Sequence, residues 1–157
     1  MKSLLVQKVI AHLRQELAVL LQAAENAHLA AIDEQSIAET QYDTLAIEAS
    51  YLAEGQSRRV FELRQSITLF QKLALKQSFQ TVMLGALVQL AQDEKANHWF
   101  FIAPAAAGFK VCIEDKHITL VTPSAPMGKA LLGKEVDDDI ELKLANQCLS
   151  DSIIALE

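Results

Sequence analysis

The first half of the chain carries apolar residues at alternating spacings of three and four, the pattern of helices that pack along a heptad seam. One row begins at Leu13 and a second begins at Ala46. In both rows the large residues lie at the outer ends and alanines lie toward the middle. The rows comprise Leu13, Leu17, Leu20, Ala24, Ala27, Ala31, Glu34 and Ala38, then Ala46, Ala49, Ala53, Gln56, Val60, Leu63, Ile67, Phe70 and Ala74.

These mirrored rows predict two helices packed antiparallel in one long coiled-coil hairpin. The predicted fold-back lies between residues 43 and 44, in the break Tyr42-Asp43-Thr44-Leu45. At about 1.5 Å per residue, arms of roughly 30 residues would extend about 45 Å. The predicted register opposes Leu17 with Phe70, Leu20 with Ile67, Ala27 with Val60 and Ala38 with Ala49.

A three-helix bundle is the alternative, with breaks near Asn26 or Gly55. Gly55 is the main objection to the hairpin, because a glycine inside a helix costs about 1 kcal/mol. The long hairpin requires both helices to continue through these positions.

From Phe79 onward the pattern changes to short alternating or β-branched runs, which predict strands. All three prolines and four of the five glycines lie in this half. A turn and a short helix from Met127 to Leu132, stopped by Gly133, interrupt the runs. The fold class is therefore α+β, with a helical domain over residues 1–76 and a globular domain over 77–157. The predicted strands are Thr81–Leu90, His98–Ala103, Lys110–Glu114, His117–Val121, Ile140–Leu144 and Ser152–Leu156.

Composition excludes several classes of protein. A hydrophobic content of 51% supports a packed core, and a net charge of -6 argues against a simple basic nucleic-acid binder. Cys112 and Cys148 form no CxxC pair, and the four histidines lack metal-ligand spacing, so we expect neither a disulfide nor a zinc site. No signal peptide or membrane-length apolar run is evident, so a cytoplasmic protein is expected.

The charge of the predicted hairpin is polarised. Seven acids and no lysine or arginine lie between Glu25 and Glu54, whereas Arg58, Arg59 and Arg64 follow directly. Such a tip would be attracted to a cationic cleft or a bound metal ion, while the arginines would meet phosphate or acidic protein. The alternative is an ordinary solvated face. The acids are Glu25, Asp33, Glu34, Glu39, Asp43, Glu48 and Glu54.

The stretch TPSAPMGKALLGKEVDDDIEL resembles the C-terminal signature of the Gre family of bacterial transcript cleavage and elongation factors. That signature runs Ser-x-x-Ser-Pro, an aliphatic residue, Gly or Ala, any residue, a small residue, two aliphatics, four residues and an acidic pair. Thr122 and Ala125 stand where the two serines would. The stretch IEASYLAEGQ also resembles the family's second coiled-coil helix, just past the tip. The matching residues are Pro126, Met127, Gly128, Ala130, Leu131, Leu132, Asp137 and Asp138.

The resemblance implies an antiparallel coiled coil joined to an FKBP-like antiparallel β domain with a short helix. It implies RNA polymerase as partner, with the globular domain docked at the rim of the secondary channel and the coiled coil reaching the active site. Nucleic acid would be met only through the elongation complex. Such a factor has no catalytic residues of its own and no cofactor except a magnesium ion shared with polymerase. The docking residues would be Pro126, Met127, Gly128 and Lys129.

The tip departs from the family pattern. Cleavage-competent members show Asp-x-x-Glu-Asn-Ala-x-Tyr, and aligning Ala49 and Tyr51 with its Ala and Tyr places Thr44 and Ile47 at the acid positions. The nearest acids, Asp43 and Glu48, would be turned about 140° from each other on a regular helix. They are the candidate residues for assisting polymerase's metal.

Other functions stay open at this point. A Gre-like factor would either stimulate transcript cleavage or only occupy the channel, as a regulator or as a competitor of other channel factors. An FKBP-like isomerase or chaperone would need an aromatic-lined pocket among Trp99, Phe100, Phe101 and Phe109. A coiled-coil adaptor would dimerise through Leu45, Ile47 and Leu52, whereas a channel factor is expected to be a monomer.

Overall fold

The computed structural model describes the backbone of residues 1–32, 44–144 and 147–157, and the side chains outside 27–53 and 143–149. The chain divides into two compact units. The helix unit is Val9–Thr68, and the sheet unit joins Met1–Lys8 to Leu69–Glu157. The prediction placed the boundary between residues 76 and 77, so the sheet unit also takes in both outer ends of the helical half.

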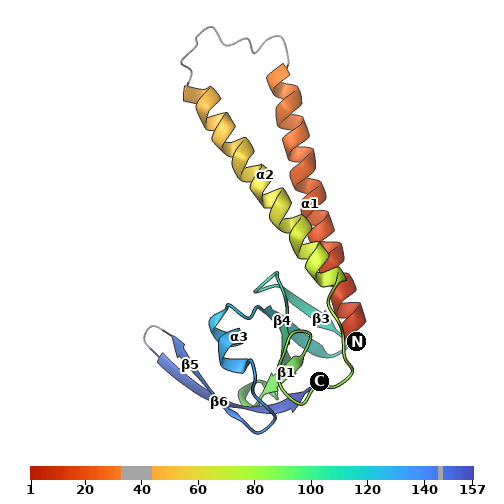
Figure 1. Ribbon diagram of the computed structural model, residues 1–157, viewed down its shortest axis with the longest axis vertical. Coiled ribbons are helices and arrows are strands. Elements are labelled where there is room, and N and C mark those ends of the chain that lie inside the picture. The colour runs from red at the N-terminus through yellow and green to blue at the C-terminus, as the bar shows by residue number, and fades with distance from the viewer. Residues whose placement is uncertain (33–43, 145–146) are drawn as a thin grey trace. The chain divides into compact units, whose positions relative to one another are not determined.

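Two long helices make up most of the first half (Figure 1). Helix α1 spans Lys2–Ile32 and helix α2 spans Thr44–Gln71. Both continue through the positions where a three-helix bundle would break, Asn26 and Gly55. Nothing within 4 Å would meet a side chain at Gly55, so this glycine marks no close approach. The long helices of the hairpin prediction are therefore confirmed.

Only the second half of the predicted break can be compared with the structure, and it is helical. Thr44 and Leu45 belong to the first turn of α2, while Tyr42 and Asp43 lie outside the described residues.

The predicted pairing register is also wrong. Arg59 of α2 forms an ion pair with Glu16 of α1 at 2.6 Å. The predicted register would place Arg59 opposite His28, about three helical turns farther along α1. The error arose because the seam was begun at Leu13, whereas Val9 is also fully buried. With Val9 included, the large apolar side chains of the seam lie nearer the start of α1, and each residue of α2 pairs with an earlier residue of α1.

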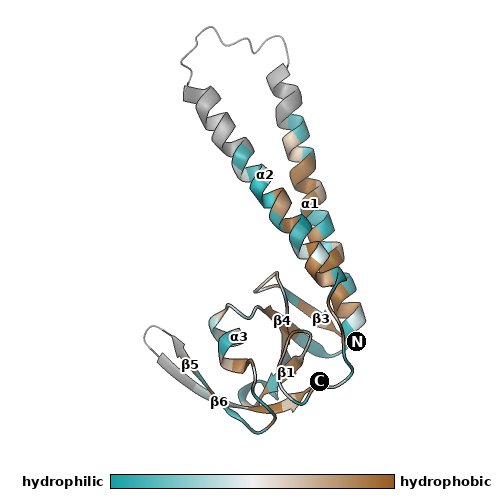
Figure 2. Cartoon of the chain, in the orientation of Figure 1, coloured by the Kyte–Doolittle hydropathy of each residue, from teal (hydrophilic) through white to brown (hydrophobic). Residues whose placement is uncertain are grey.

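The apolar faces of the helices are nonetheless as predicted. Leu13, Leu63 and Ile67 are buried, and Leu17 and Leu20 are half-buried. Figure 2 shows hydrophobic residues alternating with hydrophilic ones along both helices. Burial of one stripe per helix is what a heptad seam predicts.

The sheet unit contains one six-stranded sheet with the order β3-β4-β2-β1-β6-β5. Strands β2 and β4 run parallel, and every other pairing is antiparallel. The sheet is thus mixed, where the sequence analysis expected an antiparallel one, and the α+β class is confirmed. The strands are β1 Leu87–Leu90, β2 His98–Ile102, β3 Lys110–Ile113, β4 Lys116–Val121, β5 Asp139–Leu144 and β6 Gln147–Leu156.

The first strand is shorter than predicted, because residues 81–86 bond elsewhere. Val82 donates its N–H to the carbonyl of Lys134 at 2.7 Å and accepts from the N–H of Gly133 at 2.9 Å. Gly85 then takes a positive φ of 87°, which leads the chain into β1.

A short helix, α3, spans Pro126–Leu131 and packs on the sheet. Its Leu131 is fully buried in the core of the sheet unit. Pro126 stands at the first helical position, where a missing N–H costs nothing. The other core residues are Val82, Ala86, Val88, Leu90, Phe100, Ile102, Val121, Ile140 and Ile153.

The first turns of α1 belong to the sheet unit through two lysines. Lys2 donates from Nζ to the carbonyl of Lys76 at 2.8 Å and lies 4.5 Å from the ring centroid of Phe79. Lys8 donates to the carbonyl of Cys112 on the edge strand β3 at 3.3 Å. Burial lowers the pKa of Lys2, because the charged ammonium loses water.

Candidate functional site

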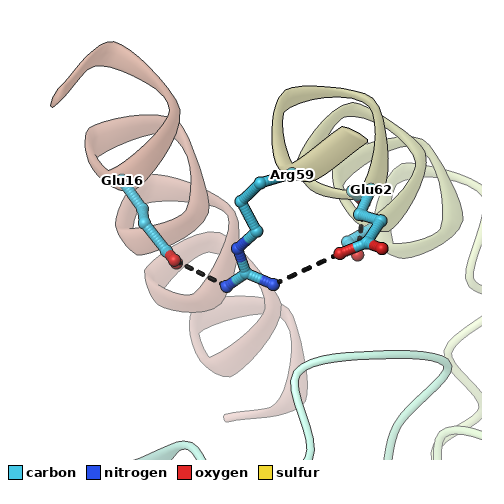
Figure 3. A network of polar contacts seen from close by, with 4 residues as sticks. Glu16, Arg59 and Glu62 are labelled. Carbon is cyan, nitrogen blue, oxygen red and sulfur yellow. Dashed lines mark hydrogen bonds and ion pairs between the residues drawn. The ribbon is translucent and has the colours of Figure 1, made fainter. Parts of the chain in front are cut away.

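The predicted arginine cluster of α2 divides into paired and unpaired members. Arg59 contacts Glu16 on α1 and also Glu62 on its own helix at 3.6 Å (Figure 3). The hydrogen bond to Glu16 raises the pKa of Arg59. Arg58 and Arg64 are exposed, and no ion pair engages either side chain within the described part of the chain. Arg59 therefore serves helix pairing, and the other two arginines are available to a partner.

The side chains of both predicted tip acids lie outside the described part of the structure. Asp43 is outside the described residues. Glu48 lies in the first half of α2, and its side chain is outside the described part. Thr44 and Ile47, which stand at the family's acid positions, occupy the first turn of α2.

The predicted docking segment is a tight turn followed by α3. Ala125 donates its N–H to the carbonyl of Thr122 at 3.0 Å, and the Thr122 and Ser124 hydroxyls are 3.2 Å apart. A Cβ on Gly128 would lie 2.0 Å from that same Thr122 carbonyl oxygen. Glycine is therefore required for α3 to close against the turn.

This packing determines which docking residues can meet a partner. Gly128 is buried, Met127 is half-buried, and Pro126 and Lys129 are exposed. The segment thus presents a proline, part of a methionine and a lysine on the surface of the sheet unit. Of the four predicted docking residues, Gly128 has a structural role.

The acidic pair that ends the signature forms a turn. The carboxylate of Asp138 accepts from the N–H of Glu135 at 2.8 Å, and its carbonyl accepts from Ile153 at 3.1 Å. Asp137 adopts a positive φ of 71° and donates its N–H to Ile153 at 2.8 Å. These acids therefore hold the approach to β5 against β6.

The sequence analysis missed a chain of polar contacts on the sheet. Asp93 Oδ1 lies 3.2 Å from His98 Nδ1, and His98 Nε2 lies 2.8 Å from the Thr119 hydroxyl. Both ring nitrogens of His98 are thus engaged, one by the nearby Asp93 and the other by Thr119, which is distant in sequence. The parallel pairing of β2 with β4 brings Thr119 to His98, and local periodicity carries no signal for that pairing.

The described residues contain no group of three or more His, Cys, Asp or Glu side chains placed to hold a metal ion. No helix within them is long and apolar enough to cross a membrane.

The aromatic residues considered for an isomerase pocket are mostly core. Trp99, Phe100 and Phe101 are buried, and Phe109 is half-buried. Three surface depressions of the sheet unit are lined without any Phe, Tyr or Trp. These depressions do not offer the aromatic lining that an isomerase would use.

The described residues thus form an α+β protein with a pair of long helices and a mixed sheet. The sheet unit carries the turn at Thr122–Ala125 and the helix α3 that follows it. No protein-family model and no curated protein matches the chain. Solved structures similar to it include the transcription factor Gfh1, at 20% identity and a TM-score of 0.38, covering 94% of this chain and 92% of that chain.

Two further similar structures are those of proteins from Thermus species. Gfh1 of Thermus aquaticus is 19% identical with a TM-score of 0.34, covering 93% of this chain and 92% of that one. GreA factor homolog 1 (Gfh1) of Thermus thermophilus is 19% identical with a TM-score of 0.36, covering 94% of each chain. These TM-scores are low, so the fold of this chain rests on its own strand order and helix contacts.

Proposed function

We propose that this chain is a Gre-like transcription factor that binds RNA polymerase. In this proposal the segment around α3 docks on the enzyme, and the hairpin of α1 and α2 enters the secondary channel. The chain acts as an accessory factor on polymerase's active site and has no catalytic residues of its own.

The observation that carries the proposal is that the Gre-like signature coincides with one tightly packed element, the turn at Thr122 followed by α3. Gly128 stands where the signature allows only Gly or Ala, and here only glycine fits beneath the Thr122 carbonyl. The aliphatic Leu131 is fully buried in the core. Pro126 and Lys129 stay exposed beside them. The signature thus builds a rigid turn and leaves a small surface for a partner.

The helices supply a second line of support. Helices of 31 and 28 residues satisfy the requirement for a long, narrow probe. The exposed Arg58 and Arg64 on α2 lie beyond the acid-rich stretch and suit contact with phosphate or acidic protein.

The tip favours channel occupancy over cleavage. The resemblance implies a magnesium ion at the tip, and magnesium takes oxygen ligands, commonly carboxylates. Ile47 offers no oxygen in its side chain, and Thr44 offers a neutral hydroxyl. The residues at these two positions therefore do not fit the ion. We propose that the factor modulates elongation by occupying the channel.

Binding to purified core RNA polymerase tests the proposal. Lys129→Glu reverses an exposed charge on the docking segment, and Lys95→Glu makes the same change at an exposed position elsewhere in the sheet unit. We expect saturable binding that Lys129→Glu weakens at least about ten-fold and Lys95→Glu leaves unchanged. No binding at micromolar concentrations, or equal effects of the two variants, would contradict the docking assignment.

A transcript cleavage assay on backtracked elongation complexes then separates the two modes of action. We expect polymerase binding without stimulated cleavage by the wild-type protein. Cleavage that is lost in Asp43→Ala or Glu48→Ala would instead assign those carboxylates to the metal. A crosslink from residue 43 into the channel would place the tip independently of either result.

A further inference from the structure

One face of the sheet changes from apolar to polar toward the edge strand β3. Phe100 belongs to the core, and His98 lies edge-on to its ring with centroids 4.7 Å apart. His98 is paired with His117 across β2 and β4. Because paired residues and alternate residues share a face of a sheet, five chemistry-bearing side chains lie on this face. They are His98, Lys110, Cys112, His117 and Thr119.

These side chains line a surface depression of about 330 Å³, together with Val111 and Ile118. The volume is at the lower end of the range of small-molecule sites, roughly 300–1,000 Å³. No carboxylate lines it, although the whole chain carries a net charge of -6. Lys110 and His117 are both exposed, so their nitrogens are within reach of a ligand. The depression is therefore a local concentration of hydrogen-bond donors in an acidic protein.

The polar chain behind the depression orients its central donors. Asp93 accepts from His98 Nδ1, which fixes the ring and leaves Nε2 on the Thr119 hydroxyl. The Thr119 hydroxyl is thereby held at the floor of the depression, where it can share hydrogen bonds with the ring and with a ligand. Asp93 is absent from the lining, so it contacts the far side of the His98 ring and does not face a ligand in the depression.

We propose that this depression binds a small phosphate monoester, with Lys110, His117 and Thr119 as the donors and Asp93 and His98 as positioning residues. Lys110 is paired directly with Thr119 across β3 and β4, so their Cβ atoms are about 5 Å apart. A phosphate monoester presents three terminal oxygens, and three donors converge from two neighbouring strands. Charged donors to phosphate form strong hydrogen bonds. The proposal does not depend on polymerase binding.

Amide chemical-shift titration of the full chain tests the site, with inorganic phosphate and glycerol 2-phosphate as probes and sodium chloride at matched ionic strength as the reference. We expect saturable shifts centred on residues 98, 110, 117 and 119 with both probes. Tighter binding of glycerol 2-phosphate would support an organic monoester as the ligand, and equal or tighter binding of inorganic phosphate would overturn that assignment in favour of the free anion.

Two lysine variants make a matched pair. Lys110→Gln removes a donor from the depression, and Lys95→Gln removes the same charge from an exposed position outside its lining. Loss of a hydrogen bond to a charged group corresponds to about a ten-fold or greater weakening, which we expect only of Lys110→Gln. Equal weakening by both variants would show that the anion senses net charge alone and would overturn the proposal.

Thr119→Val probes the hydroxyl at constant shape and should also weaken phosphate binding. The chemical shifts of the His98 ring nitrogens test the positioning role of Asp93 separately from packing. In the wild type Nδ1 should carry a hydrogen, and Asp93→Asn should change the ring signals. Shifts without saturation with either probe, in the folded wild-type protein, would also overturn the proposal.

Discussion

The two units of the molecule bury their side chains in different ways. The sheet unit closes a core of ten buried residues drawn from strands, loops and α3. Among the described side chains of the helix unit, burial follows one stripe, where Leu13, Leu63 and Ile67 are buried and Leu17 and Leu20 are only partly covered. A substitution in the core of the sheet unit therefore meets neighbours on all sides, whereas most described side chains of the helix unit are at least partly exposed to water.

Glycine illustrates the contrast most directly. A Cβ on Gly128 would lie 2.0 Å from a backbone oxygen, whereas a Cβ on Gly55 would meet nothing within 4 Å. The same replacement by alanine is thus blocked by backbone in one unit and is free in the other. The close packing of the sheet-unit core tolerates few changes in side-chain size. On the exposed face of the helix unit, helix propensity determines how a substitution changes stability.

Gly128→Ala should have the largest effect. The added methyl group must displace either α3 or the turn at Thr122, and we expect a loss of about 3 kcal/mol or more in the free energy of unfolding. Trp99, the single tryptophan, lies buried in β2 and reports unfolding of the sheet unit by fluorescence in a urea titration. A transition unchanged from wild type would show that α3 does not pack as described.

Leu63→Ala should have the next largest effect. Leu63 is 2% exposed, and removal of a buried leucine side chain costs about 2–4 kcal/mol. Leu20→Ala is the matched control at a half-buried position on the partner helix, where we expect about 1 kcal/mol or less. Far-UV circular dichroism in urea measures both variants. Equal losses would mean that burial is uniform along the seam.

Gly55→Ala should act in the opposite direction. Alanine loses less conformational freedom than glycine in a helix, so we expect the helix unit to gain about 0.5–1 kcal/mol. The same circular dichroism titration measures the gain, and the Trp99 transition serves as the internal reference for the sheet unit. A loss of stability would indicate an unseen contact at this position.

The sequence predicted the elements of both units better than their pairing. Alternation and turn residues placed β2, β4 and α3 within about one residue, since these signals are local. The run Thr81–Leu90 was overextended, because Val82 bonds to Lys134 and Gly133 far along the chain. The parallel partnership of β2 and β4 likewise joins segments that share no turn.

The register of the helices was mispredicted for a different physical reason. Sliding one heptad seam along another keeps the apolar faces together, so alanine-rich rows specify register weakly. What selects the register is the position of the large side chains and of the Glu16–Arg59 pair. Of the candidate site, the sequence supplied the segment Pro126–Lys129 but not which of its side chains are exposed, and the contact of His98 with Thr119 required the fold.

A double-mutant cycle on Glu16 and Arg59 tests that register with a smaller effect. Both side chains are partly exposed, so we expect a coupling of about 0.2–1 kcal/mol that falls as salt is added. Arg58 is adjacent in sequence but turned about 100° around the helix, so Glu16 with Arg58 supplies the control cycle. Comparable coupling in both cycles would show a general charge effect and leave the register undetermined.

The smallest expected effect is a pH dependence in the sheet unit that the helix unit should not share. Burial lowers the pKa of Lys2 below its ordinary value of 10.5. Between the lowered pKa and 10.5, the unfolded chain keeps a proton that the folded chain has released, so stability rises with pH across this window. Lys2→Gln should remove that rise from the Trp99 transition, while Lys95→Gln, an exposed lysine in the same unit, should keep it. If Lys2→Gln retains the full rise, the ammonium is not desolvated, and the seating of Lys2 between Phe79 and the Lys76 carbonyl is incorrect.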